Sequence, residues 1–213
     1  MKGLSYTLLG DGRSDRVLDF PIRWALRSIG VPVERGEWAD LSGASPKPST
    51  LTDRARIAIE LYPADLLFVH RDAENGDFED RIAEIRDAVA TVTSRYVAIV
   101  PVRMTEAWLL HDVDAIRRAS GNPNGKVDLS LPPISKLQKI PNPKLVLEEA
   151  LLKASELGAS RLKKKKKDFP QMRHRVAELI HDFGPLRELP AFMSFVDDLR
   201  TAVKALGYHI SDS

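Results

Sequence analysis

Short hydrophobic runs alternate with stretches of helical spacing through the first half of the chain. Four runs have the length and apolar character of β-strands, namely residues 4–9, 31–38, 66–70 and 96–102. Between them, apolar residues recur every three or four positions, which is the spacing of an amphipathic helix. Strands and helices that alternate in this way predict an α/β fold with a mostly parallel sheet flanked by helices.

The pattern changes near residue 120, where the strand-like runs end. Loop-like segments follow, and after them we expect three helical segments near residues 144–157, 171–183 and 191–206. We therefore divide the chain into an α/β domain over residues 1–120 and a C-terminal helical extension over residues 121–213. The extension contains a basic run and is expected to pack on the first part.

The composition is ordinary for a soluble globular protein, with 43% hydrophobic and 29% charged residues. Cysteine is absent, which excludes disulfides, thiolate metal sites and a cysteine nucleophile. The first residues lack the apolar core of a signal peptide, and no apolar run reaches membrane-spanning length. These observations predict a cytoplasmic protein that has no membrane partner.

Charges are unevenly distributed, although the formal net charge is only +2. Acidic residues concentrate in the first half, whereas the basic run, residues 161–167 (RLKKKKK), lies in the second. The run suits a nucleic-acid backbone, but it is also typical of a solvated, mobile linker, because like charges repel. We favour nucleic acid without base-specific recognition. The expected contacts are Lys163, Lys164, Lys165, Lys166, Lys167 and Arg173.

Acidic residues follow three of the predicted strands. Asp11 and Asp15 come after the first strand. Asp72 and Glu74 come after the third, and Glu106 lies beyond the fourth. In a parallel sheet these carboxylates would face one crevice at the carboxyl end, where α/β proteins usually bind ligands. Such oxygen ligands are typical of Mg²⁺ or Mn²⁺ sites, although acids in turns and helix caps are often merely solvated.

Basic side chains adjoin the same predicted crevice. Arg71 and Arg103 would either hold a substrate phosphate or neutralise the surrounding acids, and the sequence favours neither interpretation. His70 ends an apolar strand, where a structural core histidine is more common than a catalytic one.

Three motifs resemble those of Toprim domains. GDGRSDRVLDF is similar to the motif in which an acidic residue precedes glycine and a Ser/Thr-Asp pair opens a helix, and HRDAEN resembles the Asp-x-Asp motif. TEAWLL resembles a signature of a large bacterial family of Toprim-like proteins related to the overcoming-lysogenisation-defect nucleases. The resemblance covers about the first half of the chain. It implies a Toprim-like (Rossmann-like) sheet and Mg²⁺-dependent cutting or rejoining of nucleic-acid phosphodiesters.

The resemblance also implies roles for individual residues. Asp11 matches the acidic residue of general acid–base catalysis or metal binding, Asp72 the first metal-binding aspartate and Glu74 the second. Asp11 stands where glutamate is usual and Glu74 where aspartate is usual, so each charge is kept but moved by one methylene. No tyrosine lies within these motifs, which favours water as the nucleophile.

Together these inferences predict a metal-dependent nuclease, either an endonuclease or a nicking enzyme, of a kind used in phage defence or DNA processing. Asp11, Asp72 and Glu74 would bind Mg²⁺ or Mn²⁺, with Glu106 as a supporting catalytic acid. Two alternatives stay open. One is a nucleic-acid-binding effector subunit that is inactive or is activated by an ATPase or another protein partner. The other is a phosphoryl hydrolase that acts on a small substrate.

Overall fold

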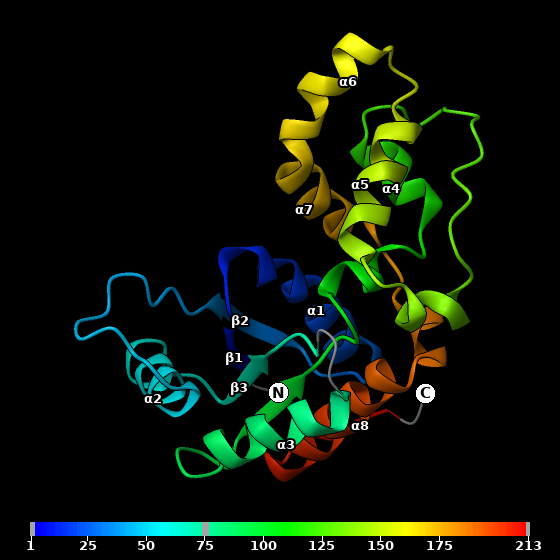
Figure 1. Ribbon diagram of the computed structural model, residues 1–213. Coiled ribbons are helices and arrows are strands. Elements are labelled where there is room, and N and C mark those ends of the chain that lie inside the picture. Colours follow the sequence, from blue (N-terminus) through cyan, green and yellow to red (C-terminus); the bar gives the residue numbers. More distant parts are fainter. Residues whose placement is uncertain (1–2, 74–76, 212–213) are drawn as a thin grey trace.

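The computed structural model describes residues 3–73 and 77–211, and its centre is a parallel sheet (Figure 1). The strands are β1 (Leu4–Leu9), β2 (Val33–Trp38), β3 (Leu66–His70) and β4 (Tyr96–Ile99). Their order in the sheet is β2-β1-β3-β4, and all three pairings are parallel. The expected α/β fold with a parallel sheet flanked by helices is therefore confirmed, and the arrangement is Rossmann-like.

Helices cover both faces of the sheet. They are α1 (Asp19–Ser28), α2 (Leu51–Leu61), α3 (Phe78–Val89), α4 (Val113–Ala119), α5 (Pro143–Ala154), α6 (Ala159–Lys165), α7 (Phe169–Leu179) and α8 (Pro190–Ala205). Short 3-10 helices are η1 (Arg13–Leu18), η2 (Thr105–Leu109), η3 (Ile134–Lys139), η4 (Lys166–Asp168) and η5 (Gly184–Glu188). None of the helices in the described residues is long and apolar enough to cross a membrane.

Successive residues of β3 point into two separate hydrophobic cores, as the two-residue period of a strand requires. Leu66 and Phe68 belong to the core formed with α1 and α8, where the Phe68 and Phe195 rings lie 6.3 Å apart. Leu67 and Val69 belong to the core formed with α2 and α3. Burial on both faces explains why β3 reads as an unbroken apolar run in the sequence.

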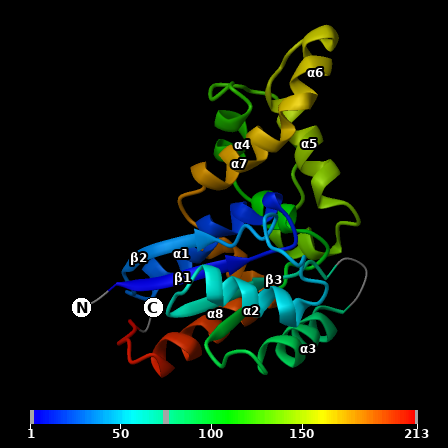
Figure 2. The same cartoon turned by 90° about the vertical axis from the view of Figure 1, so that its left-hand side faces the viewer.

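The C-terminal region is helical, as expected, and it divides into two parts. Helices α4 to α7 form a helical lobe that packs on η1 and η2, the segments after β1 and β4 (Figure 1). Helix α8 instead returns to the sheet and packs against β4 (Figure 2). The core on the α1 face continues into the lobe without a break, because buried residues of α5 and α7 belong to it.

The structure contains two helices that the hydrophobic pattern did not predict. Helix α4 lies between the α/β segment and the long loop, and α6 runs through most of the basic run. Helix α6 buries no side chain, so no apolar stripe in the sequence reveals it. The lysines of the run therefore project from a helix rather than from an extended linker.

Candidate active site

The strand order creates a crevice between β1 and β3. The chain leaves β1 toward β2 and leaves β3 toward β4, so the two connections depart in opposite directions. Ligands of open α/β sheets bind at such a switch point, outside the carboxyl ends of the strands. The segments that follow β1, β3 and β4 all contribute side chains to this place.

The turn after β1 directs Asp15 inward. The backbone N–H of Gly12 donates to Asp15 Oδ2 at 2.9 Å, and Ser14 Oγ donates to Asp15 Oδ1 at 3.0 Å. Asp15 is consequently only 8% exposed. Gly12 occupies the N-cap position of η1, and the Asp15 carboxylate accepts a bond from its backbone N–H.

His70 ends β3 and presents one nitrogen to the acids. Its Nδ1 lies 3.0 Å from the Ile99 carbonyl, which can only accept, so Nδ1 carries a proton. The other nitrogen, Nε2, lies 3.6 Å from Asp72 Oδ1 and 3.9 Å from Asp15 Oδ2. The histidine is buried and bonded, as a core residue would be, yet its Nε2 faces two carboxylates.

Asp72 is the most perturbed carboxyl of the cluster. Burial, together with the nearby charges of Asp15 and Glu106, raises its pKa to about 6, against the opposing effects of His70 and of the hydrogen bond from Thr105. Thr105 Oγ1 donates a long bond of 3.3 Å to Asp72 Oδ1. A pKa raised by neighbouring carboxylates indicates a local excess of negative charge, which a bound cation would relieve.

Glu106 is held by an arginine from the helical lobe. Arg173 Nη1 lies 2.7 Å from Glu106 Oε1, and its Nη2 donates to the Ser14 carbonyl at 2.6 Å. Both side chains are buried, and Arg173 is 8% exposed. The expected extension of the basic surface to Arg173 is therefore wrong, because its guanidinium points into the protein and pairs with Glu106.

Asp11 lies in a different environment from Asp15. Its carboxylate is part of an exposed network, 2.7 Å from Arg54 Nη1 and 2.9 Å from Arg71 Nε. Arg71 also contacts Glu84 at 2.8 Å, so this arginine neutralises acids, one of the two interpretations left open by the sequence. The carboxylates whose charges act on Asp72 are thus Asp15 and Glu106 rather than Asp11.

Arg103 stands in the turn before η2 with a positive φ of 70°, a backbone conformation that is uncommon for residues other than glycine. Glu74, the expected second metal ligand, lies outside the described residues. Lys163 to Lys167 lie in α6 and η4, and Figures 1 and 2 show α6 at the end of the helical lobe remote from the sheet.

The donor types at the crevice suit a divalent cation, because carboxylate oxygens and a histidine nitrogen are its usual protein ligands. In the chain that the structure describes, however, no three His, Asp or Glu side chains converge on one point closely enough to bind an ion. The Asp72 side chain is 31% exposed.

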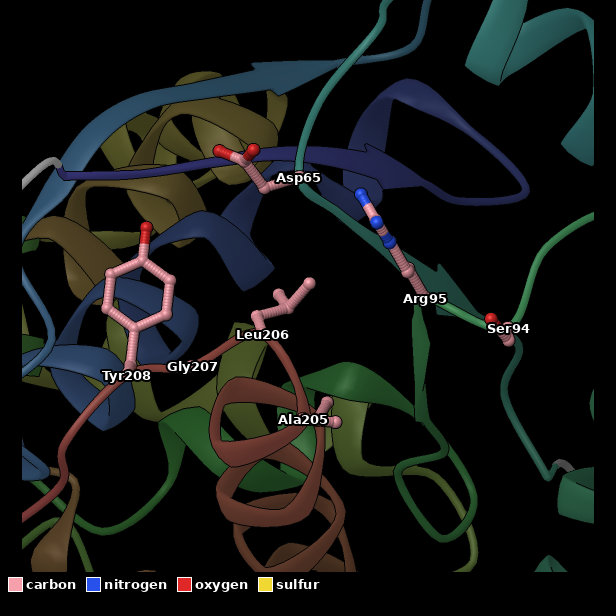
Figure 3. A pocket seen from close by; sticks show the side chains of 8 residues that line it. Asp65, Ser94, Arg95, Ala205, Leu206, Gly207 and Tyr208 are labelled. Atoms are coloured by element: carbon pink, nitrogen blue, oxygen red, sulfur yellow. The ribbon is translucent and has the colours of Figure 1, made fainter.

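Cavities lie at both ends of the sheet. A cavity of about 650 Å³ adjoins the acids on the β2 side, and Ser14 and Arg173 are part of its wall. A cavity of about 580 Å³ lies at the amino end of the sheet, bordered by Asp65, Arg95 and Tyr208 (Figure 3). The three carboxylates Asp15, Asp72 and Glu106 line neither cavity, but Ser14 and Arg173 in the wall of the first bond Asp15 and Glu106.

No protein-family model, curated protein or solved structure matches this chain. The resemblance to Toprim domains therefore stays a prediction from three short motifs.

Proposed function

We propose that the protein is a divalent-metal-dependent phosphodiesterase that hydrolyses nucleic acid, with Asp15, Asp72 and Glu106 as the acidic centre. The observation that supports this proposal most directly is the raised pKa of Asp72, about 6, to which the charges of Asp15 and Glu106 contribute. Three carboxylates that repel one another are costly to keep together unless a cation is bound for part of the reaction cycle. Their place at the switch point of the sheet adds to the case.

The residues of the centre would divide the work. Asp15 and Asp72 would bind the cation, which supplies Lewis acidity and lowers the pKa of bound water. Glu106 is kept in place by Arg173 and would complete the negative site. His70 is oriented by its bond to the Ile99 carbonyl, so that Nε2 is directed at the space where a proton could be taken from water.

The resemblance to Toprim motifs implies a role for Asp11 in acid–base catalysis or metal binding, whereas the buried position of Asp15 beside His70 favours Asp15 as a metal ligand. Asp11 is already paired with Arg54 and Arg71, and it lies at the exposed side of the crevice. We assign to this network the holding of a substrate phosphate, because a guanidinium pairs well with phosphate oxygens once its own carboxylate is displaced. Arg71 would thereby contribute to substrate binding.

The proposal is tested by cleavage of supercoiled plasmid and of single-stranded DNA and RNA, with Mg²⁺ or Mn²⁺ present. Wild type should cleave at least one of these substrates, and Asp72→Asn should be slower by about a thousandfold, the effect of losing several kcal/mol of metal-assisted stabilisation. Asp114→Asn is the matched control, because Asp114 is an exposed acid on α4.

The outcomes separate the proposal from its alternatives. Cleavage by Asp72→Asn at the wild-type rate would refute the assignment of the site. If wild type binds nucleic acid and the metal but cleaves nothing, the protein is a binding or partner-activated subunit. Hydrolysis of nucleotides without cleavage of strands would identify a small-substrate phosphoryl hydrolase.

A further inference from the structure

The cavity beside the acidic centre, hereafter the β2-side cavity, is lined by residues of five elements, β1, η1, α1, β2 and α7. Its volume of about 650 Å³ lies within the usual range of small-molecule pockets. Its wall is formed by Leu8, Arg13, Ser14, Arg16, Val17, Asp19, Phe20, Gly36, Trp38, Pro170, Arg173 and His174. Ser14 and Arg173 connect it with the centre, since Ser14 bonds Asp15 and Arg173 bonds Glu106.

Aromatic rings contribute to this wall from three of the five elements. Trp38 comes from the end of β2, Phe20 from α1 and His174 from α7. The Phe20 and His174 rings stand edge to face, with centroids 5.3 Å apart and planes at 67°. Such rings offer faces and edges to a planar ligand, and base stacking on aromatic side chains is sequence-tolerant because every base has a π-face.

Trp38 also lies against the turn that carries Asp15. A Cβ added at Gly10 would meet the indole at 2.8 Å and the Asp15 Cβ at 2.9 Å. The indole and Asp15 therefore enclose Gly10 from two sides, and only glycine fits between them. A ring stacked near Trp38 would consequently lie next to the acidic centre rather than at a remote surface.

The charges of the wall favour an anion. Arg13 and Arg16 contribute exposed guanidinium groups, and the Arg13 side chain is 78% exposed although it lies 3.5 Å from Asp40. The one carboxylate in the wall, Asp19, is already bonded to the Tyr6 hydroxyl and to Arg23 at 2.6 Å. Stacking surfaces and guanidinium groups in one cavity are the combination that binds a nucleobase together with its phosphate.

We propose that the β2-side cavity binds one unpaired nucleobase of the substrate strand and so selects single-stranded nucleic acid. This inference rests on the proposed function and names its substrate class. A base within a duplex is covered on both faces by its neighbours, whereas an unpaired base can enter a pocket and stack. Arg13 and Arg16 would bind the phosphate of that nucleotide, and the adjoining phosphodiester would lie toward Asp15 and Asp72.

The test measures binding without cleavage, in EDTA, by fluorescence anisotropy of labelled oligonucleotides. Wild type should bind a single strand at least about tenfold more tightly than a blunt duplex of the same sequence, and His174→Ala and Arg16→Ala should each weaken single-strand binding by about tenfold. Both residues are exposed, so their replacement leaves the core intact. Lys204→Ala, an exposed cation on α8, is the matched control.

A free nucleotide carries the same chemistry, so adenosine monophosphate is included as a competitor. If adenosine monophosphate displaces the oligonucleotide only at concentrations far above that of the oligonucleotide, the natural ligand is a strand. If adenosine monophosphate displaces the oligonucleotide at an equal concentration, the natural ligand of the same pocket is a free nucleotide. Equal affinity for strand and duplex, or unchanged affinity in both pocket variants, overturns the proposal.

The same variants separate this inference from the proposed function. If His174→Ala loses single-strand binding although wild type cleaves nothing, the pocket is upheld and the catalytic proposal fails. If wild type cleaves and Asp72→Asn does not, while His174→Ala and Arg16→Ala bind and cleave normally, the catalytic proposal is upheld and the pocket is refuted.

Discussion

The two ends of the sheet carry cavities of similar size but use their acidic residues differently. At the amino end, the Asp65 carboxylate accepts hydrogen bonds from the backbone N–H and the hydroxyl of Ser5, at 2.9 and 2.6 Å. These bonds join the start of β3 to β1. At the carboxyl end, Asp72 is half-buried beside two other acids, and its pKa is raised to about 6. Asp65 therefore stabilises the fold, whereas the ionised Asp72 carboxylate lowers its stability.

Cavity volume alone would not identify the functional end. What distinguishes the carboxyl end is the gathering of three carboxylates, among which Asp72 has a raised pKa although Glu106 is paired with Arg173 and Asp15 is hydrogen-bonded by Gly12 and Ser14. Natural proteins keep such costly arrangements mainly where they are used, because stability and function compete for the same residues. The same type of substitution made at both ends of the sheet tests this difference.

The largest effect on stability is expected for the buried ion pair at the carboxyl end. Arg173→Ala leaves Glu106 buried without its partner and should lower the free energy of unfolding by about 3–5 kcal/mol. Arg95→Ala, at the exposed amino-end cavity, should change it by no more than about 0.5 kcal/mol. Urea denaturation measures both.

A second substitution checks the cause of this effect. Glu106→Gln added to Arg173→Ala removes the unpaired charge and should restore part of the lost stability. If the double variant is no more stable than Arg173→Ala, the loss comes from packing of the arginine stem rather than from the charge on Glu106.

The next largest effect is that of an Asp→Asn substitution on the free energy of unfolding, and it has opposite signs at the two ends of the sheet. Asp72 binds its proton more tightly in the folded protein, with a pKa of about 6, than in the unfolded chain, where aspartate has a pKa of about 3.9. As pH rises from about 4 to 6, the Asp72 carboxylate therefore lowers the free energy of unfolding. Above that range the loss reaches up to about 3 kcal/mol. Asp72→Asn should stabilise the protein by up to this amount at pH 7.5 and have little effect at pH 4.

Asp65→Asn is the matched substitution at the amino end. It should destabilise the protein by about 1 kcal/mol at pH 7.5, because charge-assisted hydrogen bonds from Ser5 become neutral ones. Denaturation curves at both pH values measure the pair of variants. Destabilisation by both at pH 7.5 would mean that Asp72 is a structural residue like Asp65.

The smallest effect concerns the metal. At ten times its dissociation constant, Mg²⁺ or Mn²⁺ should add about 1.4 kcal/mol to the free energy of unfolding, which raises Tm by about 3–6 °C in a chain of this size. The shift should be smaller at pH 5, where Asp72 is mostly protonated. Asp72→Asn should abolish it and Asp65→Asn should retain it. An equal shift in both variants would place the bound metal elsewhere.

Much of the fold could be predicted from the sequence, because its signals are local. All four strands were predicted at nearly their observed positions, and the helical segments expected near residues 144–157, 171–183 and 191–206 correspond to α5, α7 and α8. Each of these elements has its own apolar pattern and a clear boundary. Helix α6 has no buried residue, so the same reasoning could not find it.

The site was predicted only in part, because it depends on side-chain direction and on distant contacts. Asp72 and Glu106 were identified from their positions after strands. The sequence does not show that Asp15 rather than Asp11 turns inward, since this depends on the bonds from Gly12 and Ser14. The spacing of the two aspartates by one helical turn was the available signal. Arg173 was taken for a surface residue because its pairing with Glu106 is not visible in any local pattern.

Arg173 also determines when the acidic centre can form during folding. It bonds Glu106, 67 residues earlier in the chain, and the Ser14 carbonyl, 159 residues earlier. Closing such long loops is slow and entropically costly compared with forming a helix or a neighbouring strand pair. The four strands can therefore associate before the centre is complete. A chain shortened to end before α7 would still contain every strand but would leave Glu106 without its partner.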